Sequence, residues 1–335
     1  MSNKPIAALL ASHIEGDDEQ FLSIILQFAA QEARHGRTDE AAKLKELVQS
    51  ARDRRRVSPP SGQTPIPMAR PRGELQGLVD SSYPKLTLSS MVLSRDARER
   101  LLRVIRQQQS RAALRDHGHV PTSHMLLVGP PGTGKTMTAA AIAGELHLPL
   151  FTVRLEALFS RFLGETAAKL RLLFDQIAQV RGVYLLDEFD AIGSRRAATN
   201  DVGEIRRVLN SVLAFMEEPN STDSLVIAAT NHVEILDSAL ARRFDEVIEY
   251  ALPDASAART VIESRLGKFR LHARSWKKVS AAAEGLSQGE LCRAADQVVR
   301  DAILAKADKV TGVGLENALK ARQAVQRRFR SQSEL

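Results

Sequence analysis

A glycine-rich octet, residues 129–136, constrains the fold of this chain more than any other feature of its sequence. It reads Gly-Pro-Pro-Gly-Thr-Gly-Lys-Thr and satisfies the phosphate-loop pattern. A strand-like run, residues 124–128, precedes it, and a helical pattern, residues 135–147, follows it. Because a phosphate loop joins a strand to the start of a helix, this context predicts a triphosphate site rather than an ordinary glycine-rich turn.

The residue types of the octet suit a bound nucleotide. Glycines let the backbone curl so that successive N–H groups point at the phosphates, beside the positive end of the following helix. Lys135 is expected to reach the β- and γ-phosphates, and the Thr136 hydroxyl to bind Mg²⁺. The residues predicted to bind the nucleotide are Gly129, Pro130, Pro131, Gly132, Thr133, Gly134, Lys135 and Thr136.

Composition narrows the class of protein. The 335 residues are 44% apolar and 26% charged, which is typical of soluble globular proteins with two or three domains. A single cysteine excludes an internal disulfide, and no apolar stretch approaches the ~20 residues of a membrane helix, so we expect a cytoplasmic protein. The net charge of +7 permits nucleic-acid or acidic partners, but only 4% of residues are aromatic and able to stack on bases.

The chain divides by pattern into four segments. Residues 1–56 predict a small helical domain that binds a partner or client. Proline is concentrated after it and predicts an extended linker over residues 57–84. Strand and helix patterns alternate over residues 85–252 and predict an α/β domain with a doubly wound, parallel, five-stranded sheet. Helical patterns continue over residues 253–335. The predicted strands are residues 125–128, 150–153, 183–186, 225–229 and 246–250.

Two adjacent carboxylates, Asp187 and Glu188, end one of the buried strand patterns. Mg²⁺ prefers oxygen ligands and keeps several waters, so Asp187 is expected to hold it through its hydration shell. Glu188 is expected to accept the proton of a water that attacks the γ-phosphate. Acidic residues at a strand end can also be plain surface groups, and the preceding phosphate loop favours the catalytic interpretation.

Asn231 ends the next strand pattern, and Arg242 and Arg243 follow it along the chain. The amide can hydrogen-bond both the attacking water and a γ-phosphate oxygen, although asparagine at a strand end is often a turn residue. Two adjacent arginines can simply be solvated. Phosphoryl transfer, however, often takes a guanidinium from outside to stabilise the transition state. If these arginines enter a neighbour's site, the enzyme must assemble to work.

In order and spacing, the motifs Gly-Pro-Pro-Gly-Thr-Gly-Lys-Thr, Leu-Leu-Asp-Glu-Phe-Asp, Ala-Ala-Thr-Asn and Ala-Arg-Arg-Phe-Asp resemble those of AAA ATPases, within the AAA+ superfamily. The likeness is to the protein-remodelling group that includes katanin, spastin and membrane-fusion ATPases, and to a stand-alone bacterial member. It covers about residues 85–305 and implies an ATPase domain, a helical lid and a ring, usually of six subunits. By this resemblance Arg242 and Arg243 match two arginines that act on a neighbouring subunit.

The resemblance also implies a pore and a lid contact. Arg161, Phe162 and Leu163 are similar to the central-pore loop that grips an extended polypeptide, although Phe162 could instead pack in a core. A second pore loop is expected near residues 196–202. In the lid, Gly289 still permits a close approach to the nucleotide.

The lid is also where the sequence departs from the family. The family has Ser-Gly-Ala-Asp where this chain has Ser-Gln-Gly-Glu, residues 287–290, so Gln288 replaces a glycine. Arg293, one turn later, could point at the nucleotide or at solvent. Residues 86–92 are the expected adenine-side wall.

The expected function is that of an ATP-hydrolysing ring that remodels, unfolds or translocates proteins through its pore, with ATP and Mg²⁺ as cofactors. The expected partners are copies of the chain, in a hexamer, and a protein substrate or effector bound by the N-terminal helices. Basic runs at residues 52–56 and 327–330 keep open a nucleic-acid-directed ATPase of the loader or transposition-regulator type. A scaffold that only binds ATP is disfavoured, because every predicted hydrolysis residue is present.

Overall fold

The structure, a computed structural model, describes residues 25, 42–43, 73–158, 163–189, 211–212, 214–218, 220–232, 241–269, 271 and 276–333. The chain forms two compact units, Met1–Met68 and Ala69–Leu335. The helical domain predicted over residues 1–56 lies outside the described residues, apart from Ile25, Ala42 and Lys43.

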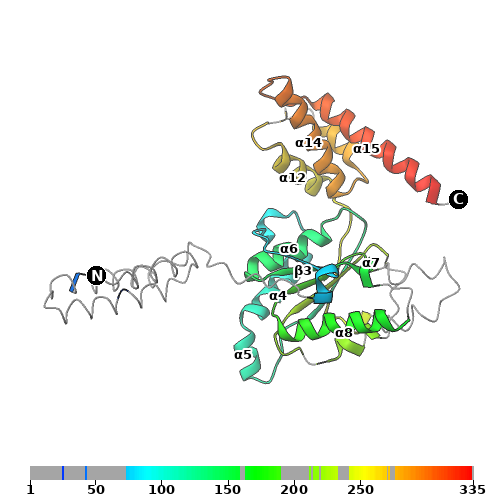
Figure 1. Cartoon of the computed structure of the whole chain (residues 1–335). Coiled ribbons are helices and arrows are strands. Elements are labelled where there is room, and N and C mark those ends of the chain that lie inside the picture. Colours follow the sequence, from blue (N-terminus) through cyan, green and yellow to red (C-terminus); the bar gives the residue numbers. More distant parts are fainter. Residues whose placement is uncertain are drawn as a thin grey trace, which may run out of the picture. The chain divides into compact units, whose positions relative to one another are not determined.

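A mixed, six-stranded sheet forms the centre of this unit (Figure 1). Its strands are β1 (Val79–Ser82), β2 (His124–Val128), β3 (Leu150–Val153), β4 (Val183–Leu186), β5 (Leu225–Thr230) and β6 (Glu246–Glu249). They lie in the order β1-β3-β4-β5-β2-β6. The strands from β2 to β6 pair in parallel, which confirms the predicted parallel core, whereas β1 pairs antiparallel with β3 at one edge.

Strand β1 corrects two predictions, the count of five strands and the extent of the linker. Together with a short 3-10 helix, η1 (Gly73–Gly77), it occupies the end of the segment predicted as linker, residues 57–84. Val79 pairs with Val153 of β3 and is buried, as is Leu78. A four-residue strand with two serines has too little alternation to be predicted, and its pairing with β3 supplies the hydrogen bonds that the sequence pattern cannot reveal.

Helices cover both faces of the sheet. They are α4 (Arg95–Gln109), α5 (Arg111–Asp116), α6 (Lys135–Leu146), α7 (Leu155–Leu158) and α8 (Leu163–Gln179), with the 3-10 helix η2 (Leu88–Ser90) before α4. Side chains alternate along β2, so Leu126 and Val128 join the core under α8, while Met125 and Leu127 join the core under α4 and α6. Figure 1 shows the two helix layers on opposite sides of the sheet.

Four helices form the lid: α12 (Ala255–Leu266), α13 (Trp276–Ala283), α14 (Gln288–Leu304) and α15 (Gly312–Ser333). Two of them begin at a favourable cap, because the Asp254 and Ser287 side chains accept backbone N–H bonds from the first turns of α12 and α14. The lid has its own apolar core. None of the helices in the described ranges is long and apolar enough to cross a membrane.

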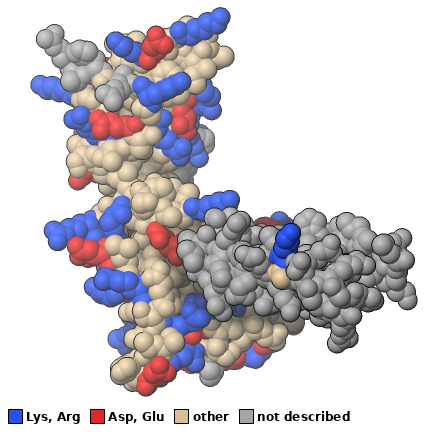
Figure 2. Space-filling view, turned by 90° about the vertical axis from the view of Figure 1, so that its left-hand side faces the viewer, with Lys and Arg blue, Asp and Glu red and all other residues tan. Residues whose placement is uncertain are grey.

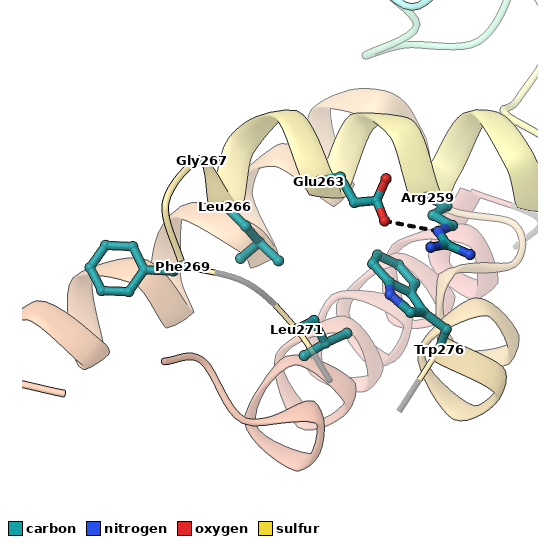
Figure 3. Close-up of a pocket in the computed structure, with 7 residues that line it drawn as sticks. All are labelled: Arg259, Glu263, Leu266, Gly267, Phe269, Leu271 and Trp276. Carbon is teal, nitrogen blue, oxygen red and sulfur yellow. Dashed lines mark hydrogen bonds and ion pairs between the residues drawn. The ribbon is translucent and has the colours of Figure 1, made fainter. Parts of the chain in front are cut away.

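A pocket of about 350 Å³ lies at the end of α12 (Figure 3). The Arg259 guanidinium lies 4.8 Å from the centroid of the Trp276 ring and pairs with Glu263 at 2.9 Å. A cation over an indole face is stabilising and helps to fix α13 against α12. None of the residues predicted to bind nucleotide lines this pocket, so it belongs to the packing of the lid.

Candidate nucleotide site

The carboxyl ends of three adjacent strands bring the predicted phosphate and hydrolysis residues together. Strand β5 lies between β4 and β2, and all three run in the same direction. The phosphate loop follows β2, Asp187 follows β4, and Asn231 follows β5. Ligands of parallel α/β sheets bind just beyond the carboxyl ends of the strands. The sheet topology therefore assembles one candidate site from segments about 100 residues apart.

Lys135 is the centre of this arrangement. Its side chain is buried, and its ammonium donates to the carbonyl oxygens of Gly129 at 2.6 Å and Pro130 at 2.9 Å. It also donates to Asn231 Oδ1 at 2.8 Å. A buried ammonium needs such oxygen partners, and they hold it at the mouth of the loop, where phosphate oxygens can join or replace them. The same bond places the Asn231 amide beside the expected γ-phosphate position.

The backbone of the loop depends on glycine where it passes the end of β6. Gly129 has a φ of +147°, and a Cβ atom there would lie 2.2 Å from the Tyr250 carbonyl oxygen. Gly134, with a φ of +101°, precedes the first residue of α6. The Tyr250 hydroxyl bonds with that of Thr138 at 2.6 Å, and burial raises the pKa of Tyr250 to about 12. Tyr250 thus supports the loop as a neutral group, a role that no sequence pattern indicated.

Two hard oxygen donors, the Thr136 hydroxyl and the Asp187 carboxylate, converge beside Lys135. Thr136 Oγ1 donates to Asp187 Oδ2 at 2.7 Å. Within the described ranges there is no group of three or more His, Cys, Asp or Glu side chains that could hold a metal. Mg²⁺ keeps several waters and takes few protein ligands when phosphates complete its shell, so this hydroxyl–carboxylate pair fits it.

Glu188 is exposed and adopts an unusual backbone conformation, with a φ of +51°. Hydrogen bonds hold it on both sides: its N–H donates to Asp187 Oδ1 at 2.9 Å, and the Phe189 N–H donates to the Ala229 carbonyl at 2.8 Å. Left-handed backbone at a non-glycine residue is costly and concentrates at functional sites. The turn presents the predicted base to solvent next to the oxygens expected to hold Mg²⁺.

Arg242 and Arg243 lie at the amino ends of the parallel strands, opposite the ends that carry the phosphate loop. They precede β6, which runs parallel to β2, and the Asp245 N–H bonds to the His124 carbonyl at the start of β2. At about 3.3 Å per residue, the five residues of β2 separate the amino ends of the strands from the phosphate loop by about 15 Å. Arg242 is exposed and Arg243 pairs with Glu217. The chain therefore does not bring these arginines to its own phosphate loop.

The lid contacts the phosphate loop through the first turn of α14. The Gly289 N–H donates to the Gly132 carbonyl at 2.8 Å, and contact of Gly289 with the nucleotide stays a prediction. Gln288 Nε2 donates to the Val92 carbonyl at 2.8 Å. Arg293 instead pairs with Glu290 at 2.7 Å, with its side chain 66% exposed.

Of the three predicted pore residues, the structure describes Leu163. Arg161 and Phe162 lie outside the described residues, as do residues 196–202. Leu163 is the first residue of α8. The pore assignment therefore stays a prediction.

Fold and site together define a phosphate-loop ATPase, and comparison with known proteins places it in a family. Residues 125–252 match the family described as "ATPase family associated with various cellular activities (AAA)". A Sinorhizobium fredii protein named as an uncharacterized AAA family ATPase, y4kL, is 32% identical over 311 residues, covering 93% of this chain and 92% of that protein. The chain belongs to the AAA family and is an ATP-hydrolysing enzyme.

Two further relatives match over a shorter stretch of this chain. The ATP-dependent zinc metalloprotease FtsH 1 of Methylacidiphilum infernorum is 36% identical over 210 residues, covering 58% of this chain and 32% of that protein. A proteasome-activating nucleotidase of Saccharolobus islandicus is 35% identical over 212 residues, covering 61% of this chain and 54% of that protein. The chain thus spans about a third and about half of these relatives.

A solved structure confirms the fold. The crystal structure of the FIGL-1 AAA domain has a TM-score of 0.60 at 19% identity, and the match covers 78% of this chain and 92% of that domain. At this identity the likeness concerns the fold alone.

Proposed function

We propose that copies of this chain assemble into a ring, of six subunits as the family resemblance implies, that uses ATP hydrolysis to remodel, unfold or translocate protein substrates through a central pore. The observation that carries this proposal is that the phosphate loop and the arginine pair lie at opposite ends of the parallel strands. The phosphate loop lies at the carboxyl ends of the strands, and Arg242 and Arg243 lie at the amino end of β6. A second copy is needed to bring them together.

Within one site, the chain's own residues perform separate tasks. Lys135 binds the β- and γ-phosphates and neutralises their charge. Asn231, which already contacts Lys135, orients the attacking water, and Glu188 accepts its proton. Thr136 and Asp187 would hold Mg²⁺, which supplies charge neutralisation on the phosphate oxygens.

The trans contribution comes from the arginine pair. Phe244 is buried, and the Asp245 carboxylate accepts the N–H groups of Ser123 and His124, so the segment that carries the arginines is fixed to the sheet. The Arg243–Glu217 pair is 37% and 59% exposed, and surface pairs of this kind exchange partners at little cost. In the ring, a γ-phosphate of the neighbouring copy takes the place of Glu217.

Relatives and surface charge favour protein over nucleic acid as the substrate. The relatives' names refer to a protease and to proteasome activation. The printed sequence contains no His-Glu-x-x-His motif of the zinc metalloprotease kind. Among the described residues on the face shown in Figure 2, basic and acidic side chains are interspersed rather than arranged in the single-sign stripe typical of nucleic-acid binding.

Mixing two inactive variants tests the shared site. Arg243→Ala keeps its own phosphate loop, and Glu188→Gln keeps its arginines, so each alone should lose at least ~100-fold in turnover while still binding ATP. In mixed rings with equal amounts of the two variants, random placement gives an intact base and an intact arginine at about a quarter of the sites between neighbouring subunits. About a quarter of the ATPase activity of the unaltered protein should therefore return.

Arg95 provides the control substitution for the mixing experiment. Arg95→Ala removes an exposed arginine whose side chain is 92% accessible, and it should hydrolyse ATP as the unaltered protein does. Mixed rings verified by native mass spectrometry that show no recovery would overturn the shared site. Stimulation by single-stranded DNA, with none by an unfolded protein, would instead favour the nucleic-acid alternative.

A further inference from the structure

One side chain of the lid, that of Gln288, reaches across to the wall beside the phosphate loop. Gln288 is the first residue of α14, whose N-cap is Ser287. Its Nε2 donates to the Val92 carbonyl oxygen at 2.8 Å, across 196 residues of sequence. Val92 lies between η2 and α4, and its side chain packs against the lid core. The contact therefore joins the lid to the segment expected to border the base.

The surroundings of this side chain place it beside the phosphate loop as well. A Cβ atom at Gly134 would lie 3.9 Å from Gln288 Oε1 and 3.4 Å from Met91 Cε. The next residue, Gly289, donates its N–H to the Gly132 carbonyl at 2.8 Å. Two adjacent residues of α14 thus bond to two different segments: Gly289 to the phosphate loop through its backbone, and Gln288 to the expected adenine-side wall through its side chain.

These two bonds hold the start of α14 to two separate segments of the α/β domain, and the loss of one would loosen that attachment. A glycine at residue 288, which the family resemblance implies, would keep only the backbone bond to Gly132. We propose that Gln288 is a positioning residue for nucleotide binding, which docks the lid helix α14 on the Val92 wall and sets the gap that the nucleotide enters. This inference rests on the proposed nucleotide site and adds to it a determinant of affinity that lies outside the phosphate loop.

The proposal separates binding from chemistry. Gln288 contacts Val92, in the segment expected to border the base, while the hydrolysis residues Asp187, Glu188 and Asn231 follow β4 and β5. Removal of one neutral hydrogen bond that orients the lid should weaken ADP and ATP binding alike, by about 5- to 10-fold. Turnover at saturating ATP should change by less than about two-fold, because the hydrolysis groups keep their contacts.

The test uses the full chain and a matched pair of substitutions. Gln288→Met keeps the length of the side chain and removes its N–H groups without adding charge. Gln323→Met is the control, because Gln323 Nε2 makes the same kind of bond, to the Glu284 carbonyl at 2.9 Å, within the lid. Affinities for ADP and ATP are measured by calorimetry, and exchange of the Gly289 amide hydrogen is followed by mass spectrometry in nucleotide-free protein.

We expect Gln288→Met to bind both nucleotides more weakly and to exchange the Gly289 amide faster, with Gln323→Met unchanged in both respects. Gln288→Gly should reproduce the loss, which excludes a steric effect of methionine. Unchanged affinity and exchange in folded Gln288→Met would overturn the inference, as would an equal loss in Gln323→Met. If Lys135→Ala also bound ADP normally, the nucleotide site itself would fail; if Lys135→Ala alone lost binding, only the role of Gln288 would fail.

Discussion

At the residue scale, the phosphate loop was predictable because its chemistry is local. Lys135 and Thr136 stand in one octet, and the converging oxygens of Asp187 and Asn231 follow from strand ends that parallel pairing brings together. The bond from Gln288 to Val92 was not predictable in the same way. It joins residues 196 positions apart, and neither has a pattern that singles out the other. Tyr250 is a similar case, since only the fold reveals that it supports the loop.

Gly129 gives a test of how tightly the loop is built. Gly129→Ala would place a methyl group 2.2 Å from the Tyr250 carbonyl oxygen, at a φ of +147°. We expect a loss of ~2–4 kcal/mol in the free energy of unfolding, together with loss of ATP binding. Gly118→Ala is the control, because Gly118 has a φ of +78° but open space around its Cβ position.

The Gly118→Ala control separates the effect of backbone strain on stability from the effect of steric overlap. It should cost only ~1–2 kcal/mol and leave nucleotide affinity unchanged. Urea unfolding and calorimetric titration with ADP measure both quantities. Equal destabilisation by the two substitutions would mean that the contact with Tyr250 does not shape the loop.

At the scale of elements, the strands from β2 to β6 match the predicted ones within a residue or two, because buried parallel strands are continuous apolar runs. Strand β1 was missed, since only Leu78 and Val79 in its vicinity are buried and its Asp80 and Ser82 face solvent. Strand β2 also carries a polar residue at its first position, His124, that the apolar pattern alone does not explain.

His124 makes the stability of this strand sensitive to pH. Burial lowers the pKa of His124, more than the nearby Asp245 carboxylate raises it. The unfolded chain binds a proton near the ordinary histidine pKa of about 6.5, and the folded chain does so only at lower pH. The free energy of unfolding should therefore fall as the pH drops below about 6.5, by at most ~1.4 kcal/mol per pH unit.

Urea unfolding at pH 7.5 and pH 5.5 checks this expectation. His124→Asn should flatten the difference in stability between the two conditions, because the group that titrates is gone. His119→Asn, at an exposed histidine, should keep it. A His124→Asn protein with the same pH dependence as the unaltered chain would contradict the assignment.

At the scale of the whole molecule, the described apolar cores draw only on residues from Leu75 to Leu319. The second unit, Ala69–Leu335, should therefore fold without residues 1–68. We expect the truncated chain to melt within about 3 °C of the full chain and to bind ADP equally well. Differential scanning calorimetry and ADP titration measure this, and a truncated chain that is insoluble or melts more than ~10 °C lower would contradict it.

The arrangement of the sheet has a genetic consequence. A copy that lacks Arg243 keeps an intact phosphate loop, since the arginines and the loop occupy opposite ends of the strands. In the proposed ring, its defect would fall on the neighbouring copy. In a cell that makes both forms, each altered copy in the proposed ring would silence one neighbouring site and keep its own, so the ATPase rate of the pool should fall in proportion to the altered share.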